Sequence, residues 1–256
     1  MQQPASTPSD VTLAAASALA RLRDKGPRVH CITNAVAQNF TANVLLSLGC
    51  VPSMTLSTEE IGGFVAGAQA LLVNLGTFDA ERRQATELAV KAAADNKIPW
   101  VLDPVFVDRS RPRADFARAL LGRGPSALRL NRAELSALAE GDASPEAFAR
   151  ASRTVVGLSG ATDVIADSAR LAHVANGHPL MSRVTAMGCA ASALTAACLA
   201  VEPDAFRAVA GALVIIGVAG ELAGEKAAGP GSFAVAIIDA LYNLDAATLT
   251  ARARVT

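Results

Sequence analysis

Short β-rich runs alternate with longer helical runs through the first two thirds of this 256-residue chain. Strand-like runs lie at residues 29–33, 52–56, 70–74, 99–102 and 127–130, and the helical runs between them include 40–48, 79–96 and 114–121. This alternation predicts a mainly parallel central sheet with helices on both faces, a three-layer α/β fold. Ligands of such sheets bind outside the carboxyl ends of the strands, so the residues that end each strand are the first candidates for a site.

The order of elements changes after residue 160. Residues 164–167 and 171–175 are predicted to pair antiparallel, and Asn176-Gly177 is a hairpin signal with 179–184 as the return arm. From Cys189 onward the chain is predicted to be almost entirely helical. No linker, low-complexity tract or internal repeat interrupts the pattern, so we expect one domain over residues 1–256.

Two helix starts follow from capping residues. Residue 9 or 10 is predicted to cap a helix that runs through residue 22. Residue 57 or 58 is predicted to open a second helix, with the glutamates at 59–60 in its first turn.

Composition excludes several classes of partner. The formal net charge is 0, and the chain has one Trp and one Tyr, which leaves few cations or stacking platforms for nucleic acid. The four cysteines lack C-x-x-C spacing and are expected to be reduced thiols in the cytosol. Residues 1–10 show no secretory pattern, and the apolar runs 189–201 and 208–220 are shorter than the roughly 20 residues that span a bilayer. We therefore expect a cytoplasmic protein without a membrane segment.

Residues 184–189, Val-Thr-Ala-Met-Gly-Cys, lead directly into the apolar run 190–201. The pattern predicts a tight turn into a buried helix, whose free amides and dipole favour a phosphoryl group. The same field lowers a thiol pKa, which predicts a partly ionised Cys189. Two alternatives remain open: Cys189 is a small buried apolar residue, or it pairs with His178 in a hydrolytic site.

Charged and amide side chains end two of the predicted strands. Asp103 is placed to bind magnesium, which takes one or two carboxylates beside substrate phosphates, and Arg129 is placed to hold an ATP phosphate. Glu134 follows Asn131 by three residues, so both can face one site. The alternatives are structural: Asp103-Pro104 as a turn, and Asn131 with Glu134 as a helix cap.

The chain has neither a G-x-x-x-x-G-K-[ST] phosphate loop nor a strand-borne G-x-G-x-x-G. Its motifs in order instead resemble those of the hydroxyethylthiazole kinases of the ribokinase-like superfamily. These motifs are VHCITN at 29–34, NFTAN at 39–43, NLGT at 74–77, LDPV at 102–105, NGHPL at 176–180, VTAMGC at 184–189 and GPGSF at 229–233.

The resemblance implies a ribokinase-like fold and transfer of the γ-phosphoryl group of ATP, with Mg²⁺, to the hydroxyl of 4-methyl-5-(2-hydroxyethyl)thiazole in thiamine salvage. It also implies a homotrimer with active sites at subunit interfaces. It assigns roles to nine residues: Met54, Asn34 and Ala186 to the thiazole, Arg129, Ser159 and Asn131 to ATP, Asp103 and Glu134 to the metal and phosphates, and Cys189 to catalysis.

Three positions depart from the family pattern. Phe106 follows Asp103-Pro104-Val105 where small and glycine-rich residues are usual, Leu130 replaces the glycine of Arg-Gly-Asn, and Ala161 stands in the place of a glutamate. The changes around Phe106 and Leu130 keep open a thiazole-binding protein with impaired catalysis. A kinase of another small hydroxylated heterocycle is the alternative if Met54 and Asn34 do not contact the thiazole.

Overall fold

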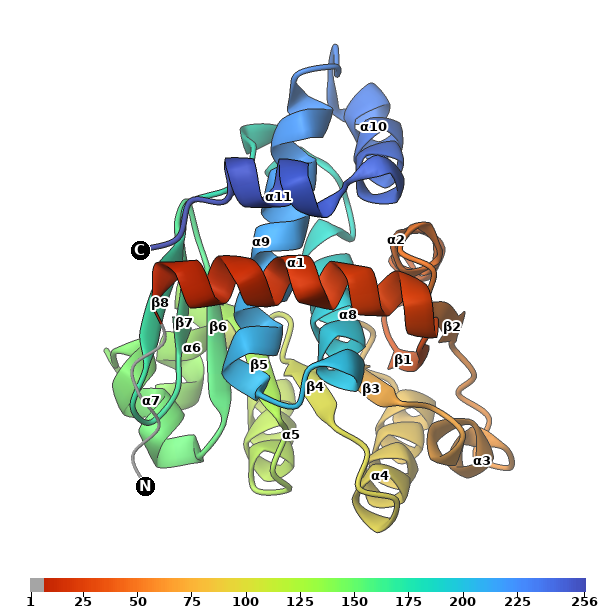
Figure 1. The fold of residues 1–256 in the computed structure, drawn as a ribbon. Coiled ribbons are helices and arrows are strands. Elements are labelled where there is room, and N and C mark those ends of the chain that lie inside the picture. Colours follow the sequence, from red (N-terminus) through yellow and green to blue (C-terminus); the bar gives the residue numbers. More distant parts are fainter. Residues whose placement is uncertain (1–6) are drawn as a thin grey trace.

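The computed structural model describes residues 7–256, which form an eight-stranded sheet between two layers of helices (Figure 1). The strand order is β2-β1-β3-β4-β5-β6-β7-β8, parallel from β2 to β6 and antiparallel from β6 to β8. The predicted three-layer α/β fold is confirmed. Residues 1–6, part of the segment predicted to lack a secretory pattern, lie outside the described residues.

The strands are β1 (Arg28–Ile32), β2 (Val51–Ser53), β3 (Ala70–Asn74), β4 (Trp100–Asp103), β5 (Ala127–Asn131), β6 (Val155–Ser159), β7 (Asp163–Ala166) and β8 (Leu171–Val174). The α-helices are α1 (Pro8–Lys25), α2 (Gln38–Ser47), α3 (Ile61–Ala66), α4 (Ala80–Asp95), α5 (Arg111–Leu121), α6 (Arg132–Ala139), α7 (Pro145–Ser152), α8 (Met187–Val201), α9 (Ala205–Gly224), α10 (Pro230–Asn243) and α11 (Ala246–Arg252). Two short 3₁₀ helices are η1 (Val107–Arg109) and η2 (Pro179–Arg183).

Each face of the sheet has its own apolar core. Helices α1, α2 and α8–α11 pack on one face, and α3–α7 pack on the other (Figure 1). Strand β3 is buried at all five positions, as expected for a parallel strand covered on both sides. Helix α9 has the length and hydropathy of a membrane span, but most of it is buried within the protein, where it packs against α1, α8 and α10. Helix α9 is longer than the apolar run 208–220 read from the sequence, and its buried side chains make it a core helix.

The predicted hairpin at Asn176-Gly177 is wrong. Strand β8 pairs with β7, and the turn between them lies at residues 167–170, where Asp167 Oδ1 accepts from the backbone amide of Arg170 at 2.6 Å. The expected return arm is the 3₁₀ helix η2, which begins at Pro179. Asn176 uses its side chain for contacts far along the chain, so its sequence neighbourhood alone does not fix its role.

Both predicted helix starts shift by a few residues. Thr7 caps α1, in a capping box with Asp10, and the helix extends to Lys25. Helix α3 begins at Ile61 without a side-chain cap, and the glutamates at 59–60 precede it. The predicted cap of α4 at Asp79 is confirmed, because its carboxylate accepts from the backbone amide of Arg82.

Strand register brings the site candidates to one edge of the sheet. Asn74 lies opposite Asp103 across β3 and β4, and Asn131 lies opposite Ser159 across β5 and β6. Because these strands are parallel, their carboxyl ends meet at the same edge. The start of α8 approaches this edge.

We predict that His30 makes folding pH-dependent. The His30 side chain is buried, with Nδ1 2.8 Å from Ser53 Oγ and Nε2 3.1 Å from the Thr55 carbonyl oxygen, and burial lowers its pKa to about 4. Between pH 6.5 and 4 the unfolded chain binds a proton at this residue that the folded chain does not, so stability falls as pH falls. At pH 5 the expected loss is on the order of 2 kcal/mol.

Urea denaturation of the wild type and His30→Gln at pH 7.5 and pH 5 measures this contribution. We expect His30→Gln to lose less stability between the two pH values than the wild type. The control is His173→Gln, a histidine substitution on β8 away from the His30 contacts. An equal loss in His30→Gln and the wild type would contradict the assignment.

Candidate active site

The amide of Asn74 links the ends of two strands to helix α8. Its Nδ2 donates to Asp103 Oδ2 at 2.7 Å and to Cys189 Sγ at 3.3 Å. Its Oδ1 accepts from the Gly76 backbone amide at 3.0 Å and from Asn34 Nδ2 at 3.3 Å. Asn74 is 1 % exposed, so these bonds form away from solvent, where a polar group must be paired.

Cys189 lies in the first turn of α8. Its Sγ accepts from the side-chain amides of Asn34, at 3.2 Å, and Asn74. Ala186, the N-cap residue before Met187, has a φ of +72° in the left-handed region that favours glycine, and no side chain of residues 7–256 caps this end of the helix. The first amides of the helix therefore remain free for an anion, as the sequence predicts.

The predicted ionisation of Cys189 is wrong. Burial, reinforced by the nearby Asp103 carboxylate, raises the thiol pKa to about 11 despite the helix dipole. At neutral pH Cys189 is thus a thiol, able to donate or accept a hydrogen bond but not a thiolate nucleophile. Desolvation of the sulfur outweighs the helix-terminus field here.

Asp103 is the buried acid of the site. Burial raises its pKa to about 6, a shift opposed by Arg129 and by hydrogen bonds from Asn74 and Ser192. Ser192, one turn after Cys189, donates from Oγ to Asp103 Oδ2 at 2.8 Å. At neutral pH the carboxylate form of Asp103 predominates, held by two neutral donors.

A cavity of about 650 Å³ opens beside the start of α8. Arg129 and Ser159, from β5 and β6, line one side of it, and Met187 and Gly188 line another. Arg129 Nη1 donates to the Gly188 carbonyl oxygen at 3.1 Å, and Ser159 Oγ donates to the Leu130 carbonyl oxygen at 3.1 Å. The structure therefore brings two of the three predicted nucleotide residues into one cavity.

Asn131 and Glu134 form the helix cap that was the structural alternative. Asn131 Oδ1 accepts from the Glu134 backbone amide at 3.0 Å, and Glu134 Oε2 accepts from the Asn131 backbone amide at 2.9 Å. Glu134 Oε1 accepts from the Phe106 backbone amide at 2.9 Å. Glu134 thus fixes the loop after β4 as well as the start of α6.

In the described part of the chain, residues 7–256, no three His, Cys, Asp or Glu side chains cluster closely enough to form a metal site alone. A magnesium ion at Asp103 and Glu134 would therefore need water or phosphate oxygens as further ligands.

Of two other residues singled out from the sequence, His178 lies in the lining of this cavity and Met54 is not among the lining residues. Met54 follows edge strand β2 and is half-buried against the core. The ring of His178 stacks on Phe233, with centroids 5.6 Å apart, and its Nδ1 accepts from the Leu180 backbone amide. Within residues 7–256 no hydrogen bond joins His178 to Cys189, so the hydrolytic pair does not form.

Sequence reasoning did not assign site roles to Asn74 and Ser192. Asn74 ends a strand and lies in the NLGT motif, and Ser192 follows Cys189 by one helical turn. A site role for Asn74 can be inferred only once the sheet register is known, because the register places Asn74 beside Asp103.

Comparison with known proteins places this geometry in a family. Residues 19–247 match the model of the hydroxyethylthiazole kinase family. The chain belongs to the hydroxyethylthiazole kinase family.

A probable hydroxyethylthiazole kinase of Agrobacterium fabrum is 45 % identical over 242 residues, covering 94 % of each chain. The solved structure of the hydroxyethylthiazole kinase protein from Pyrococcus horikoshii OT3 has a TM-score of 0.91 at 38 % identity, covering 94 % of this chain and 98 % of that one. A ribokinase-like superfamily protein from Enterococcus faecalis has a TM-score of 0.66 at 13 % identity, covering 86 % of this chain and 88 % of that one, and supports the fold alone.

Within the hydroxyethylthiazole kinase family, this chain accommodates its departures locally. Phe106 adopts a left-handed φ of +62°, and its exposed ring lies near the Arg109 guanidinium. Leu130 turns into the apolar core, where it is 1 % exposed. Neither change breaks the Asp103–Asn74–Cys189 network.

We predict that Cys189 reacts slowly with alkylating agents. A pKa of about 11, against 9 for an unperturbed thiol, lowers the thiolate fraction at pH 7.5 about 100-fold. The measurement is the rate of iodoacetamide labelling at Cys189, read by peptide mass spectrometry. Denatured protein, in which all four cysteines react, is the control. Labelling of the folded protein at the denatured rate would contradict the raised pKa.

Proposed function

We propose that this protein transfers the γ-phosphoryl group of ATP, with Mg²⁺, to the hydroxyl of 4-methyl-5-(2-hydroxyethyl)thiazole in thiamine salvage. One observation carries the proposal: the uncapped start of α8, with Cys189 in its first turn, connects the buried Asp103–Asn74 network to the cavity lined by Arg129. Phosphoryl transfer needs aligned reactants and charge neutralisation, and this arrangement offers both.

Two buried polar atoms that have no hydrogen-bond partner among residues 7–256 support binding of such reactants. Arg129 Nε, beside the cavity, is a free donor suited to a phosphate oxygen. Asn34 Oδ1, beside Cys189, is a free acceptor suited to an alcohol hydroxyl. An unpaired buried polar group costs about 1–3 kcal/mol, so a ligand that pairs both atoms gains that energy on binding.

On the nucleotide side we assign Arg129 and Ser159 to ATP phosphates, with Asn131 at the mouth of the site. Asp103 and Glu134 would hold Mg²⁺ together with ATP oxygens. When bound, the ion neutralises charge on the phosphates and aligns them for transfer. The free amides at residues 187–189 stabilise negative charge on the transferred oxygens.

On the acceptor side we assign Met54, Asn34 and Ala186 to the thiazole. The Cys189 thiol orients the hydroxyl by hydrogen bonding, because a pKa of about 11 leaves it protonated at neutral pH. A loose transition state needs little base assistance, so the hydroxyl proton leaves late and passes to an oxygen of the transferred phosphoryl group as ADP departs.

We further propose that the single domain forms a homotrimer whose subunit interfaces complete the active site. Met54 follows β2, which lies at an edge of the sheet. Beside it, a groove of about 860 Å³ is lined by Val51 and Phe64, both exposed apolar side chains. A second copy covering this groove would bury them and close the acceptor pocket around Met54.

The test is incubation of purified protein with the thiazole alcohol and Mg-ATP, followed by ³¹P NMR. We expect a new phosphate monoester that requires both magnesium and the alcohol.

Asp103→Asn, which removes the buried charge, is expected to lower kcat about 10²–10³-fold. Cys189→Ala removes one orienting hydrogen bond, so kcat should fall about 5–10-fold with the Kd of the alcohol little changed.

Asp142→Asn, at an exposed loop position, is the matched control and keeps wild-type turnover. Thiazole binding without product would favour the binding-protein alternative. Product from another hydroxylated heterocycle, with none from the thiazole, would favour the other kinase. Unchanged turnover in Cys189→Ala would remove the thiol from the mechanism.

A further inference from the structure

Residues 253–256 run alongside β8 at the edge of the sheet. Val255 bridges Val174 in antiparallel fashion, and His173 and Thr256 exchange backbone hydrogen bonds at 2.7 and 3.0 Å. The backbone amide of Ala175 donates to the Arg254 carbonyl oxygen at 2.9 Å. The start of this short segment, at Arg254, therefore lies beside the loop 176–178, and its end, at Thr256, lies beside His173.

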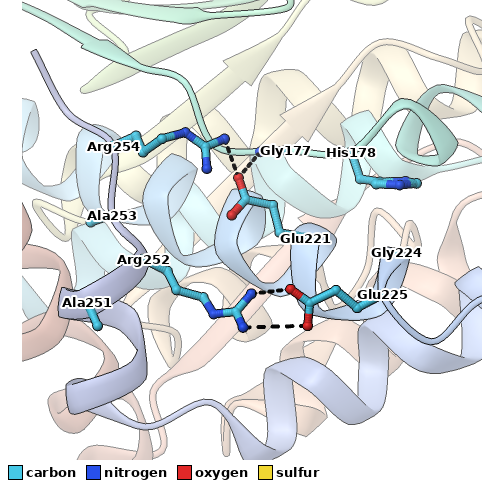
Figure 2. Close-up of a pocket in the computed structure, with 9 residues that line it drawn as sticks. All are labelled: Gly177, His178, Glu221, Gly224, Glu225, Ala251, Arg252, Ala253 and Arg254. Carbon is cyan, nitrogen blue, oxygen red and sulfur yellow. Dashed lines mark hydrogen bonds and ion pairs between the residues drawn. The ribbon is translucent and has the colours of Figure 1, made fainter.

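The buried side chain of Asn176 ties that loop to its neighbours. Its Oδ1 accepts from the Arg254 backbone amide at 2.7 Å, and its Nδ2 donates to the Arg252 carbonyl oxygen at 2.8 Å and to Glu221 Oε1 at 3.0 Å. Glu221 Oε1 also accepts from the Gly177 backbone amide at 3.1 Å and from Arg254 Nη2 at 2.5 Å (Figure 2). The single oxygen Glu221 Oε1 thus accepts hydrogen bonds from three donors.

The loop held in this way is a wall of the proposed nucleotide cavity. Asn176, Gly177 and His178 line the same cavity as Arg129 and Ser159. Helix α9 fixes the position of the wall because glycines face it. A Cβ at Gly217 would lie 2.7 Å from Asn176 Cβ, and one at Gly224 would lie 2.4 Å from His178 Cδ2. The wall therefore rests on one face of α9, on the helix backbone at Gly217 and Gly224 and on the side chain of Glu221 between them.

We infer that Glu221 is a positioning residue for nucleotide binding, which sets the 176–178 wall of the cavity through Asn176, Gly177 and Arg254. The inference rests on the proposed function for the identity of the ligand. Charge-assisted hydrogen bonds of a mostly buried carboxylate are stronger than those of an exposed pair, and the Glu221 side chain is 14 % exposed. Loss of Glu221 frees the wall and weakens nucleotide binding without touching the acceptor pocket.

A second ion pair, also formed by a glutamate of α9, supplies the control. Glu225, one turn further along α9, pairs with Arg252 (Figure 2). Its side chain is 54 % exposed, and the hydrogen bonds it makes go to Arg252 rather than to the 176–178 wall. An exposed pair of this kind contributes little, so its removal should leave the cavity unchanged.

The experiment measures the Kd of Mg²⁺ with a non-hydrolysable ATP analogue by calorimetry, without any acceptor. We expect Glu221→Ala to raise this Kd about tenfold, and Glu221→Gln, which keeps an acceptor oxygen, to restore it to within about threefold of wild type. Glu225→Ala should match wild type. In turnover, the KM for ATP should rise in Glu221→Ala while the KM for the thiazole alcohol stays constant.

Arg254→Ala and its control Arg252→Ala keep the test decisive if Glu221→Ala does not fold, with a rise in Kd expected only for Arg254→Ala. Equal Kd values in wild type and Glu221→Ala, or parallel rises in both KM values, would overturn the inference. A wild type that binds the analogue but does not phosphorylate the alcohol refutes the proposed function alone, because the Kd ratio still decides the role of Glu221. A wild type that does not bind the analogue overturns both.

Discussion

The side-chain amide of Asn74 is the interaction on which the candidate site depends. It ends β3, donates to the Asp103 carboxylate that ends β4, and donates to the Cys189 sulfur at the start of α8. Without it, two strand ends and one helix start would lose a shared partner, and a buried carboxylate would lose one of its two neutral donors. Buried networks are stable only when their members are paired, so this amide constrains both the fold and the chemistry.

The network also explains how a carboxylate and a thiol coexist at one buried position. Burial raises the pKa of both groups, to about 6 for Asp103 and about 11 for Cys189. At neutral pH the first therefore bears the charge and the second keeps its proton. Asp103 can therefore supply negative charge, and Cys189 can orient the acceptor hydroxyl by hydrogen bonding. The amides at the start of α8 stay free for the oxygens of the transferred group.

Local sequence signals predicted what local geometry controls. The alternation of runs predicted the three-layer sheet, and the spacing of Asn131 and Glu134 included the helix cap that forms as one of its two interpretations. The predicted ionisation of Cys189 was wrong because the direction of its pKa shift depends on desolvation by residues distant in sequence. A helix-start motif does not reveal that burial. The hairpin at Asn176 was wrong for a related reason: its amide bonds to Glu221 and Arg252, 45 and 76 residues away, and these contacts outweigh the local turn signal.

A double-mutant cycle on kcat/KM between Asn74→Ala and Cys189→Ala tests most directly whether the site works as one network. Side chains that act through a shared hydrogen bond give non-additive losses, so the double variant should lose no more activity than the more damaging single variant, within about twofold. Glu225→Ala combined with Cys189→Ala, a pair without a shared partner, should be additive. Additive losses for Asn74 and Cys189 would contradict a single network and would separate the thiol from the strand-end residues.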